Sequence, residues 1–301
     1  MRLPDGVLGM AGRGPDWAAF VDRLPRLVDE LAEEWELRRE GWMMHGYCAL
    51  VVPVLQRDGT PAVLKVAFPD AESEHEHLAL TRWAGRGAVR LLRADPHRRA
   101  LLLEQLRDVS LADAWDVEAC TAVGELYGQL HIPAPAPLRT LSSYVADVRE
   151  RLEALPRNAP VPRRLVEQAL SLIGDFVTDS ATDGTLVHAD LHYANVLAGD
   201  RATWLAIDPK PLSGDPHYEP APMLWNRYDE LRGDVRNGIR RRFHTIIDTA
   251  GLDEDRARDW VVVRMLDVAR QRLEDPPGVR RQLPTEQLLT TCVAIAKAVQ
   301  D

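Results

Sequence analysis

The alternation of hydrophobic and polar positions divides the chain into a strand-rich first third and a helical remainder. Residues 16–37 carry apolar side chains at helical spacing, and Pro25 interrupts them, so a broken helix is expected here. Residues 46–56 and 61–68 are apolar runs of strand length. Asp58-Gly59 lies in the turn between them and is typical of a hairpin. The segment therefore predicts a helix followed by an antiparallel strand pair.

The first third ends with another helix and two more strands. Residues 70–84 indicate a helix that the glycines of Gly85-Arg86-Gly87 would end. Short apolar runs at 88–92 and 100–103 follow, joined by a turn at 95–97. A sheet with few covering helices is expected.

Beyond Leu106 the spacing of apolar residues changes to that of helices. Helices are expected at 111–131, 141–155, 162–176, 256–273 and 285–299, and strand-like runs at 186–188, 195–198 and 204–207. The pattern predicts an α+β protein: a small strand-rich lobe (1–106) and a larger helical lobe (107–301) with a short hairpin inside it.

Composition excludes several function classes. The chain has 301 residues and a net charge of −9, which argues against nucleic acid as the main partner. The longest apolar run, 49–55, is too short to span a membrane, and the first residues lack the apolar core of a secretory signal. We expect a cytoplasmic protein, with no membrane partner, that is a monomer or a homodimer. Its only cysteines, Cys48, Cys120 and Cys292, are too widely spaced for a zinc knuckle.

A polar cluster around residue 190 has the layout of a phosphotransferase catalytic loop. An apolar run delivers His188 and Asp190 into a loop, Asn195 follows five positions after Asp190, and Asp208 ends the next apolar run. A carboxylate such as Asp190 can orient an acceptor hydroxyl and receive its proton. An amide and a carboxylate, here Asn195 and Asp208, are oxygen ligands that suit magnesium. We interpret His188 as holding the loop more than acting as a base.

A lysine inside a strand of the first lobe is the candidate phosphate anchor. The chain has only three lysines, Lys65, Lys210 and Lys297, against many arginines, so a lysine kept within a strand needs a reason. Lys65 requires an acidic partner, and Glu72, Glu74 and Glu76 of the next predicted helix are candidates. In Glu74-His75-Glu76-His77, alternate residues of a helix point in different directions, so a zinc site is rejected.

These motifs, in this order, resemble aminoglycoside phosphotransferases, above all the streptomycin 6-phosphotransferase and hydroxyurea phosphotransferase branch. The resemblance is carried by His188-Ala-Asp-Leu-His-Tyr-Ala-Asn195, by the run from Ala206 to Pro216 and by Ala62-Val-Leu-Lys65. It implies a protein-kinase-like bilobal fold, ATP (GTP is left open), Mg²⁺ and phosphate transfer to a small-molecule hydroxyl. The first lobe would then be the nucleotide-binding lobe and the second the catalytic and acceptor-binding lobe.

The resemblance also implies roles for single residues. It selects Glu76 as the partner of Lys65 and places the adenine against a segment that includes Glu104 and Leu106. The segment 41–47 would be the phosphate-covering loop, although its two glycines fit an ordinary hairpin almost equally well. Lys210 would meet the transferred phosphate or form a structural ion pair. The candidate acceptor-binding residues are Asp215, His217, Glu219, Trp225, Asn226 and Asp229.

Three departures and two alternatives accompany this interpretation. Ala189 and Ala194 stand where the family usually has glycine, and Glu219 stands where it usually has an aspartate that braces the catalytic loop. The expected acceptor is an aminocyclitol antibiotic, a cation that the acidic second lobe would attract. The alternatives are a metabolic kinase of the same fold and a non-catalytic pseudokinase-like module.

Overall fold

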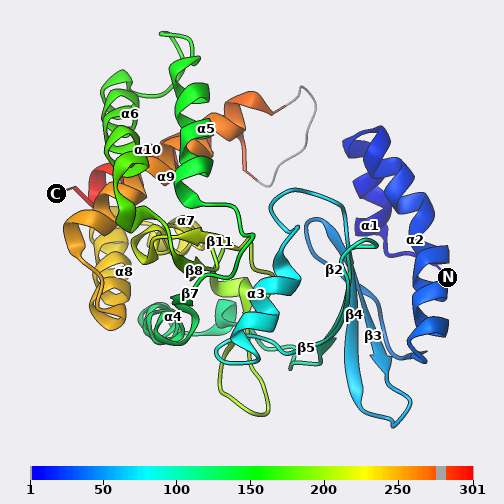
Figure 1. Cartoon of the computed structure of the whole chain (residues 1–301). Coiled ribbons are helices and arrows are strands. Elements are labelled where there is room, and N and C mark those ends of the chain that lie inside the picture. Colours follow the sequence, from blue (N-terminus) through cyan, green and yellow to red (C-terminus); the bar gives the residue numbers. More distant parts are fainter. Residues whose placement is uncertain (1, 276–282, 301) are drawn as a thin grey trace. The chain divides into compact units, whose positions relative to one another are not determined.

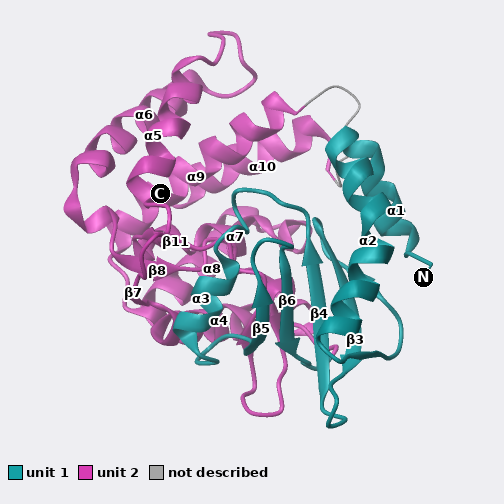
Figure 2. Cartoon of the chain, turned by 45° about the vertical axis from the view of Figure 1, so that its right-hand side comes forward, with its two compact units in different colours: residues 1–107 teal, residues 108–301 magenta. Residues whose placement is uncertain are grey.

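The computed structural model describes residues 2–275 and 283–300, and it divides into two compact units, residues 1–107 and 108–301 (Figures 1 and 2). Each unit contains sheet and helix. The expected lobe boundary after residue 106 lies one residue before this division. The expected second lobe also includes residues 276–282 and 301, which lie outside the described part.

Unit 1 is built on an antiparallel sheet. Its strands are β1 (Arg38–Arg39), β2 (Met44–His45), β3 (Ala49–Leu55), β4 (Pro61–Ala67), β5 (Leu91–Asp95) and β6 (Ala100–Glu104). The order is β1-β3-β4-β6-β5, and β2 also pairs with β3. The predicted hairpin is confirmed as β3 and β4, whereas β5 begins three residues after the start of the apolar run that predicted it.

Two N-terminal helices cover one face of this sheet, α1 (Asp5–Met10) and α2 (Pro15–Glu34). Leu64 and Val66 of β4 belong to the same buried cluster as Leu24 and Leu31 of α2. Because successive side chains of a strand point to opposite faces, Lys65 lies on the face away from α2. The helix continues through Pro25 rather than breaking there, since its buried apolar stripe runs on both sides of the proline.

The helix of unit 1 that supplies acidic residues is shorter than predicted. It is α3 (Glu76–Trp83), not a helix from residue 70. The Asp70 carboxylate accepts hydrogen bonds from the Ser73 backbone N–H (2.7 Å) and hydroxyl (2.9 Å), which forms a local turn in competition with a helix. Glu76 therefore stands at the start of α3.

Unit 2 is mainly helical. Its helices are α4 (Asp116–Leu130), α5 (Leu141–Glu153), α6 (Arg163–Thr178), α7 (Ala221–Trp225), α8 (Val235–Ala250), α9 (Glu254–Glu274) and α10 (Thr285–Ala298). Side chains from α5 to α10 form one buried core that includes Trp260 and Phe243. The sequence analysis assigned no element to α8, whose apolar stripe is interrupted by arginines.

Short strands in unit 2 carry the candidate catalytic loop, residues 188–195. β8 (Thr185–Val187) is the centre of a three-stranded sheet between β7 (Ile132–Pro133) and β11 (Leu212–Gly214). β9 (Val196–Leu197) and β10 (Leu205–Ala206) form the predicted hairpin. Within the described ranges, no helix is both long and apolar enough to cross a membrane.

Candidate active site

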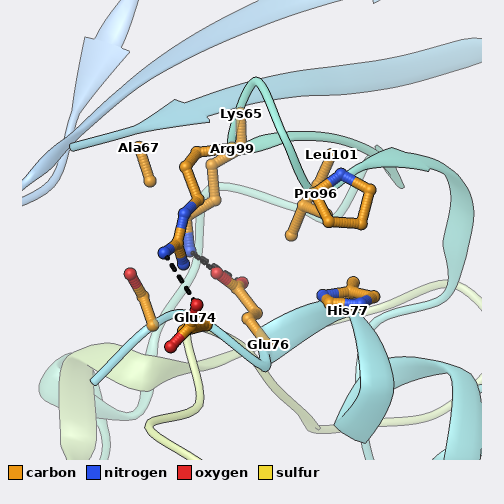
Figure 3. Close-up of a pocket in the computed structure, with 9 residues that line it drawn as sticks. Lys65, Ala67, Glu74, Glu76, His77, Pro96, Arg99 and Leu101 are labelled. Atoms are coloured by element: carbon orange, nitrogen blue, oxygen red, sulfur yellow. Dashed lines mark hydrogen bonds and ion pairs between the residues drawn. The ribbon is translucent and has the colours of Figure 1, made fainter. Parts of the chain in front are cut away.

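In unit 1, Lys65 and Glu76 form a buried ion pair. The Lys65 Nζ lies 2.7 Å from each carboxylate oxygen of Glu76, and the residues are only 7% and 3% exposed (Figure 3). Glu72 is exposed, and Glu74 instead contacts Arg99 at 3.4 Å. The structure thus places Glu76, of the three candidate acids, against the strand lysine.

A pocket adjoins this ion pair. Arg99 borders it with a left-handed backbone (φ 53°), and Figure 3 shows its guanidinium beside Glu74. Burial, and then the neighbouring His75, lower the pKa of His77, which favours a neutral imidazole on the wall of this pocket. The pocket is lined by Lys65, Ala67, Ser73, Glu74, Glu76, His77, Pro96, Arg99 and Leu101.

The expected adenine-binding segment follows β6 directly. Glu104 ends that strand, and its Oε1 accepts a hydrogen bond from the Arg90 backbone N–H at 2.8 Å. The Glu104 N–H donates in turn to the Arg90 carbonyl at 3.0 Å. Leu106 lies two residues beyond and is half-buried. Glu104 therefore ties the end of β6 to the chain before β5, and its carboxylate has a structural partner.

In unit 2, His188 holds the catalytic loop from inside. It is fully buried, its Nδ1 accepts a hydrogen bond from the Asp190 N–H (3.3 Å), and its Nε2 donates to the Ile207 carbonyl (2.9 Å). Burial lowers the pKa of His188, so the ring is neutral, and the accepting Nδ1 fixes the proton on Nε2. The interpretation of His188 as a loop-holding residue agrees with this geometry.

Glu219 braces the same loop. Its carboxylate is completely buried and accepts hydrogen bonds from the His188 and Ala189 backbone N–H groups. Burial alone would raise the pKa of Glu219, but His131, whose Nε2 lies 3.7 Å from Oε1, and the loop N–H groups hold it below the usual value. Tyr127 donates to the Glu219 carbonyl at 3.0 Å. No part of the Glu219 residue is exposed, and its expected contact with an acceptor stays a prediction.

The loop holds Asp190 half-buried at its turn. Burial raises the pKa of Asp190, against the lowering effect of His188, Lys210 and Arg264. Ala189, just before it, has φ 62°, the left-handed conformation that explains the usual glycine. The Arg264 guanidinium donates to the Ala189 carbonyl at 2.7 Å. Asp190 is thus oriented through backbone contacts while its carboxylate stays near cations.

Asn195 and Asp208 are brought together by the hairpin of β9 and β10. Val196 pairs with Ala206, and the Ile207 N–H donates to the Asn195 carbonyl at 2.9 Å. The Asn195 amide nitrogen donates to the Asp190 carbonyl at 2.8 Å, which leaves Oδ1 as the remaining side-chain oxygen. Asp208, in a left-handed conformation, has Oδ1 3.1 Å from the Lys210 Nζ. One amide oxygen and one carboxylate fit a magnesium ion that takes its other ligands from phosphates and water.

Asp215, another candidate acceptor-binding residue, is an internal hub. It is buried, and it accepts hydrogen bonds from the His217 backbone N–H (3.0 Å), the His217 Nδ1 (2.6 Å), the Arg256 Nε (2.5 Å) and the Trp260 Nε1 (2.7 Å). The His217 Nε2 accepts from the Asp253 N–H at 3.0 Å. Asp215 therefore links the 3₁₀ turn Pro216–Tyr218 to α9, and these internal contacts occupy its carboxylate oxygens, so its expected role toward an acceptor stays a prediction.

The other candidates lie at or after the end of α7. Trp225 is half-buried, with Arg264 over its ring at 5.3 Å, and Asp229 is exposed. The Asn226 amide donates to the Pro222 carbonyl at 2.9 Å, and its own carbonyl accepts from Arg242 at 2.8 Å. Trp225 and Asp229 thus keep surface that an acceptor could use.

Sequence reasoning missed the supporting residues of the loop, Arg264, His131 and Tyr127. Arg264 is an arginine amid the buried stretch 260–266 of α9, and a polar residue amid buried apolar neighbours is the signal that could have found it. His131 follows α4 and stacks on Tyr127, at 5.0 Å between ring centroids. Their contacts with 188–219 depend on tertiary packing.

Comparison with known proteins gives consistent matches over most of the chain. The family model described as aminoglycoside/hydroxyurea antibiotic resistance kinase matches residues 34–275. The chain is 40% identical to a streptomycin 6-kinase of Streptomyces glaucescens, over 91% of this chain and 92% of that protein. It is 41% identical to a hydroxyurea phosphotransferase of Kitasatospora aureofaciens, over 89% and 77% respectively.

Solved structures agree on the fold. An amicoumacin kinase in complex with AMP-PNP, Ca²⁺ and Ami matches with a TM-score of 0.57 at 13% identity, over 90% of this chain and 93% of that one. At this identity the match shows the fold alone. The predicted protein-kinase-like α+β fold is confirmed.

Proposed function

Because this chain belongs to the aminoglycoside/hydroxyurea antibiotic resistance kinases, it is a phosphotransferase with a hydroxyl acceptor, and we propose that it transfers the γ-phosphoryl group of ATP to an aminocyclitol antibiotic. The relatives named streptomycin 6-kinase make streptomycin the first acceptor to test. The loop geometry of unit 2 carries the proposal: a half-buried Asp190 held by its backbone, next to Asn195 and Asp208.

Asp190 would accept a hydrogen bond from the acceptor hydroxyl and so aim the hydroxyl oxygen at the γ-phosphorus. The oxygen–phosphorus bond forms as the bond to the β-phosphate oxygen breaks, and ADP leaves with that oxygen. Since the transition state is loose, the hydroxyl proton would pass late to the Asp190 carboxylate. Positioning the hydroxyl would therefore be the main contribution of Asp190. The raised pKa of Asp190 suits a group that must bind that proton.

The cationic and metal-binding groups would organise the nucleotide. Lys65, fixed by Glu76, presents a compact ammonium suited to a phosphate oxygen. Asn195 Oδ1 and the Asp208 carboxylate would hold Mg²⁺, which neutralises phosphate charge when bound. Lys210, whose Nζ lies 3.1 Å from the Asp208 Oδ1, would meet the transferred phosphate with its ammonium.

The test is a product assay with purified protein, magnesium and either ATP or GTP. Streptomycin, other aminocyclitols, hydroxyurea and a panel of sugars and amino alcohols are offered as acceptors, and mass spectrometry looks for one added phosphate. Phosphorus NMR locates the modified hydroxyl. A streptomycin product that is absent with an Asp190→Asn control supports the proposal. Turnover of hydroxyurea or a metabolite, with none of any aminocyclitol, would replace the proposed acceptor.

A further inference from the structure

The segment 41–47 of unit 1 leaves much of its apolar surface uncovered. It connects β1 to β3 and contains the short strand β2, which pairs with Leu50 and Val51. Trp42 is 92% exposed and Tyr47 is 60% exposed. Burial within a core therefore fixes little of this segment, and its position depends on contacts at its ends.

Arg13 makes one such contact from the N-terminal helices. Its Nη1 donates a hydrogen bond to the Tyr47 backbone carbonyl at 2.6 Å, and its guanidinium lies 4.1 Å from the centre of the Tyr47 ring. The same guanidinium lies 4.7 Å from the Trp17 ring, which stacks on Phe68 at 3.7 Å. Arg13 is thus held between an anchored ring of α2 and the end of the segment.

Gly6 of α1 makes the second contact. A Cβ atom built on Gly6 would lie 2.0 Å from the His45 Nε2 and 2.4 Å from its Cε1. Only a residue without a side chain lets the His45 ring lie this close to α1. The N-terminal helices therefore touch the segment at two points, His45 and Tyr47.

We propose that Arg13 is a positioning residue for nucleotide binding, because it holds segment 41–47 in the conformation that covers the phosphates. The inference rests on the proposed function, in which this segment is the phosphate-covering loop. A loop held in place before binding loses less conformational freedom when the nucleotide arrives. The family match begins at residue 34, so Arg13 and Gly6 lie outside the part of the chain that the family model describes, whereas His45 and Tyr47 lie within it.

Arg13→Ala should weaken ATP binding without slowing the chemical step. A hydrogen bond from a charged donor is lost, so we expect the KM for ATP and its Kd to rise about 5- to 30-fold. The kcat and the KM for the acceptor should stay within about twofold. Arg13→Lys, which keeps the charge but loses the planar contact with Tyr47, should be intermediate. Arg23→Ala, at an exposed position of α2, is the matched control and should behave as wild type.

A second pair of variants tests the contact between α1 and segment 41–47 without changing the charge of Arg13. Gly6→Ala should displace His45 and raise the Kd for ATP, whereas Gly9→Ala, where an added Cβ meets nothing within 4 Å, is the matched control on the same helix and should bind ATP as the wild type does. Calorimetric titration with ATP and a magnesium salt gives the Kd, and the thermal midpoint separates positioning from loss of fold.

The outcomes distinguish this inference from the function on which it rests. If the wild type uses ATP but Arg13→Ala binds it equally well, the positioning role of Arg13 is wrong and the proposed function stands. If kcat and the acceptor KM change as much as the ATP KM, Arg13 acts on the fold as a whole and the inference is overturned. A wild-type protein that neither binds nor uses ATP or GTP would overturn both.

Discussion

Lys65 of unit 1 and Asp190 of unit 2 are both charged groups removed from water, yet the protein holds them in different ways. Lys65 is fixed through its charge, because both Glu76 oxygens lie 2.7 Å from its Nζ. Asp190 is fixed through its backbone: its N–H donates to His188, and its carbonyl accepts from Asn195. In unit 1 the ammonium that we propose binds the nucleotide also makes the structural contact. In unit 2 the Asp190 backbone makes the structural contacts, and the side-chain carboxylate is left for the proposed chemistry.

This difference predicts which of three properties, stability, nucleotide binding and turnover, should change together in each unit. Removing one partner of a buried ion pair leaves an uncompensated charge, so stability and nucleotide binding should fall together in unit 1. In unit 2 the brace is Glu219 and the proposed reacting carboxylate is Asp190, so stability and turnover should be separable. Substitutions in each unit test whether stability and turnover can be changed separately.

Asp190→Asn should abolish most turnover at little cost in stability. The amide keeps the size of the side chain but cannot accept the proton, so kcat should fall by about 10²–10⁴. The thermal midpoint should be unchanged or higher, since burial disfavours the charge that is removed. Single-turnover rates, nucleotide affinity and thermal unfolding measure the three quantities. A stability loss as large as that of Lys65→Ala would end the contrast between the units.

Lys65→Ala should lose both stability and nucleotide binding. Leaving the buried Glu76 without its cation should cost about 3–5 kcal/mol in the free energy of unfolding. The double variant Lys65→Met/Glu76→Leu should regain most of that stability, because apolar residues of similar size replace the pair, but it should not regain ATP binding. Urea unfolding and ATP titration of the single and double variants check this. A double variant that binds ATP normally would show that Lys65 does not contact the nucleotide.

Glu219→Gln should destabilise the loop by about 1–3 kcal/mol, since one oxygen that accepts a loop N–H becomes a donor. Glu219→Asp is the matched control: it keeps the charge with a shorter reach and should lose less. Urea unfolding gives the free energies, and amide hydrogen exchange of Ala189 reports the loop directly. Unchanged exchange in Glu219→Gln would mean that His188 and Arg264 hold the loop without the brace.

Ala189→Gly should have the smallest effect. The left-handed φ of 62° disfavours alanine, and glycine relieves that strain while adding freedom to the unfolded chain. The two terms oppose each other, so the free energy of unfolding should change by less than about 1 kcal/mol, and kcat should be unchanged. Parallel urea unfolding and turnover assays would detect a larger change, which would show that the alanine methyl has a packing role.

Local patterns in the sequence predicted several elements and the order of the motifs. The apolar runs on either side of Asp58-Gly59 predicted the hairpin of β3 and β4, and the spacing of Asp190, Asn195 and Asp208 indicated a phosphotransferase loop. The hairpin was predicted correctly because neighbouring residues determine strand alternation and turns. The start of α3 was misplaced because the Asp70 turn competes with a helix there.

The amino-acid sequence by itself determined the fold class, the catalytic-loop motif and the family to which the chain belongs. Only the tertiary structure decided that Glu219 braces the loop, that Asp215 is a buried hub on α9 and that Arg13 reaches Tyr47. The physical reason is distance along the chain. Contacts between residues 30 or more positions apart depend on how whole elements pack, and an acidic side chain looks the same in the sequence whether packing buries it against backbone N–H groups or leaves it facing a substrate.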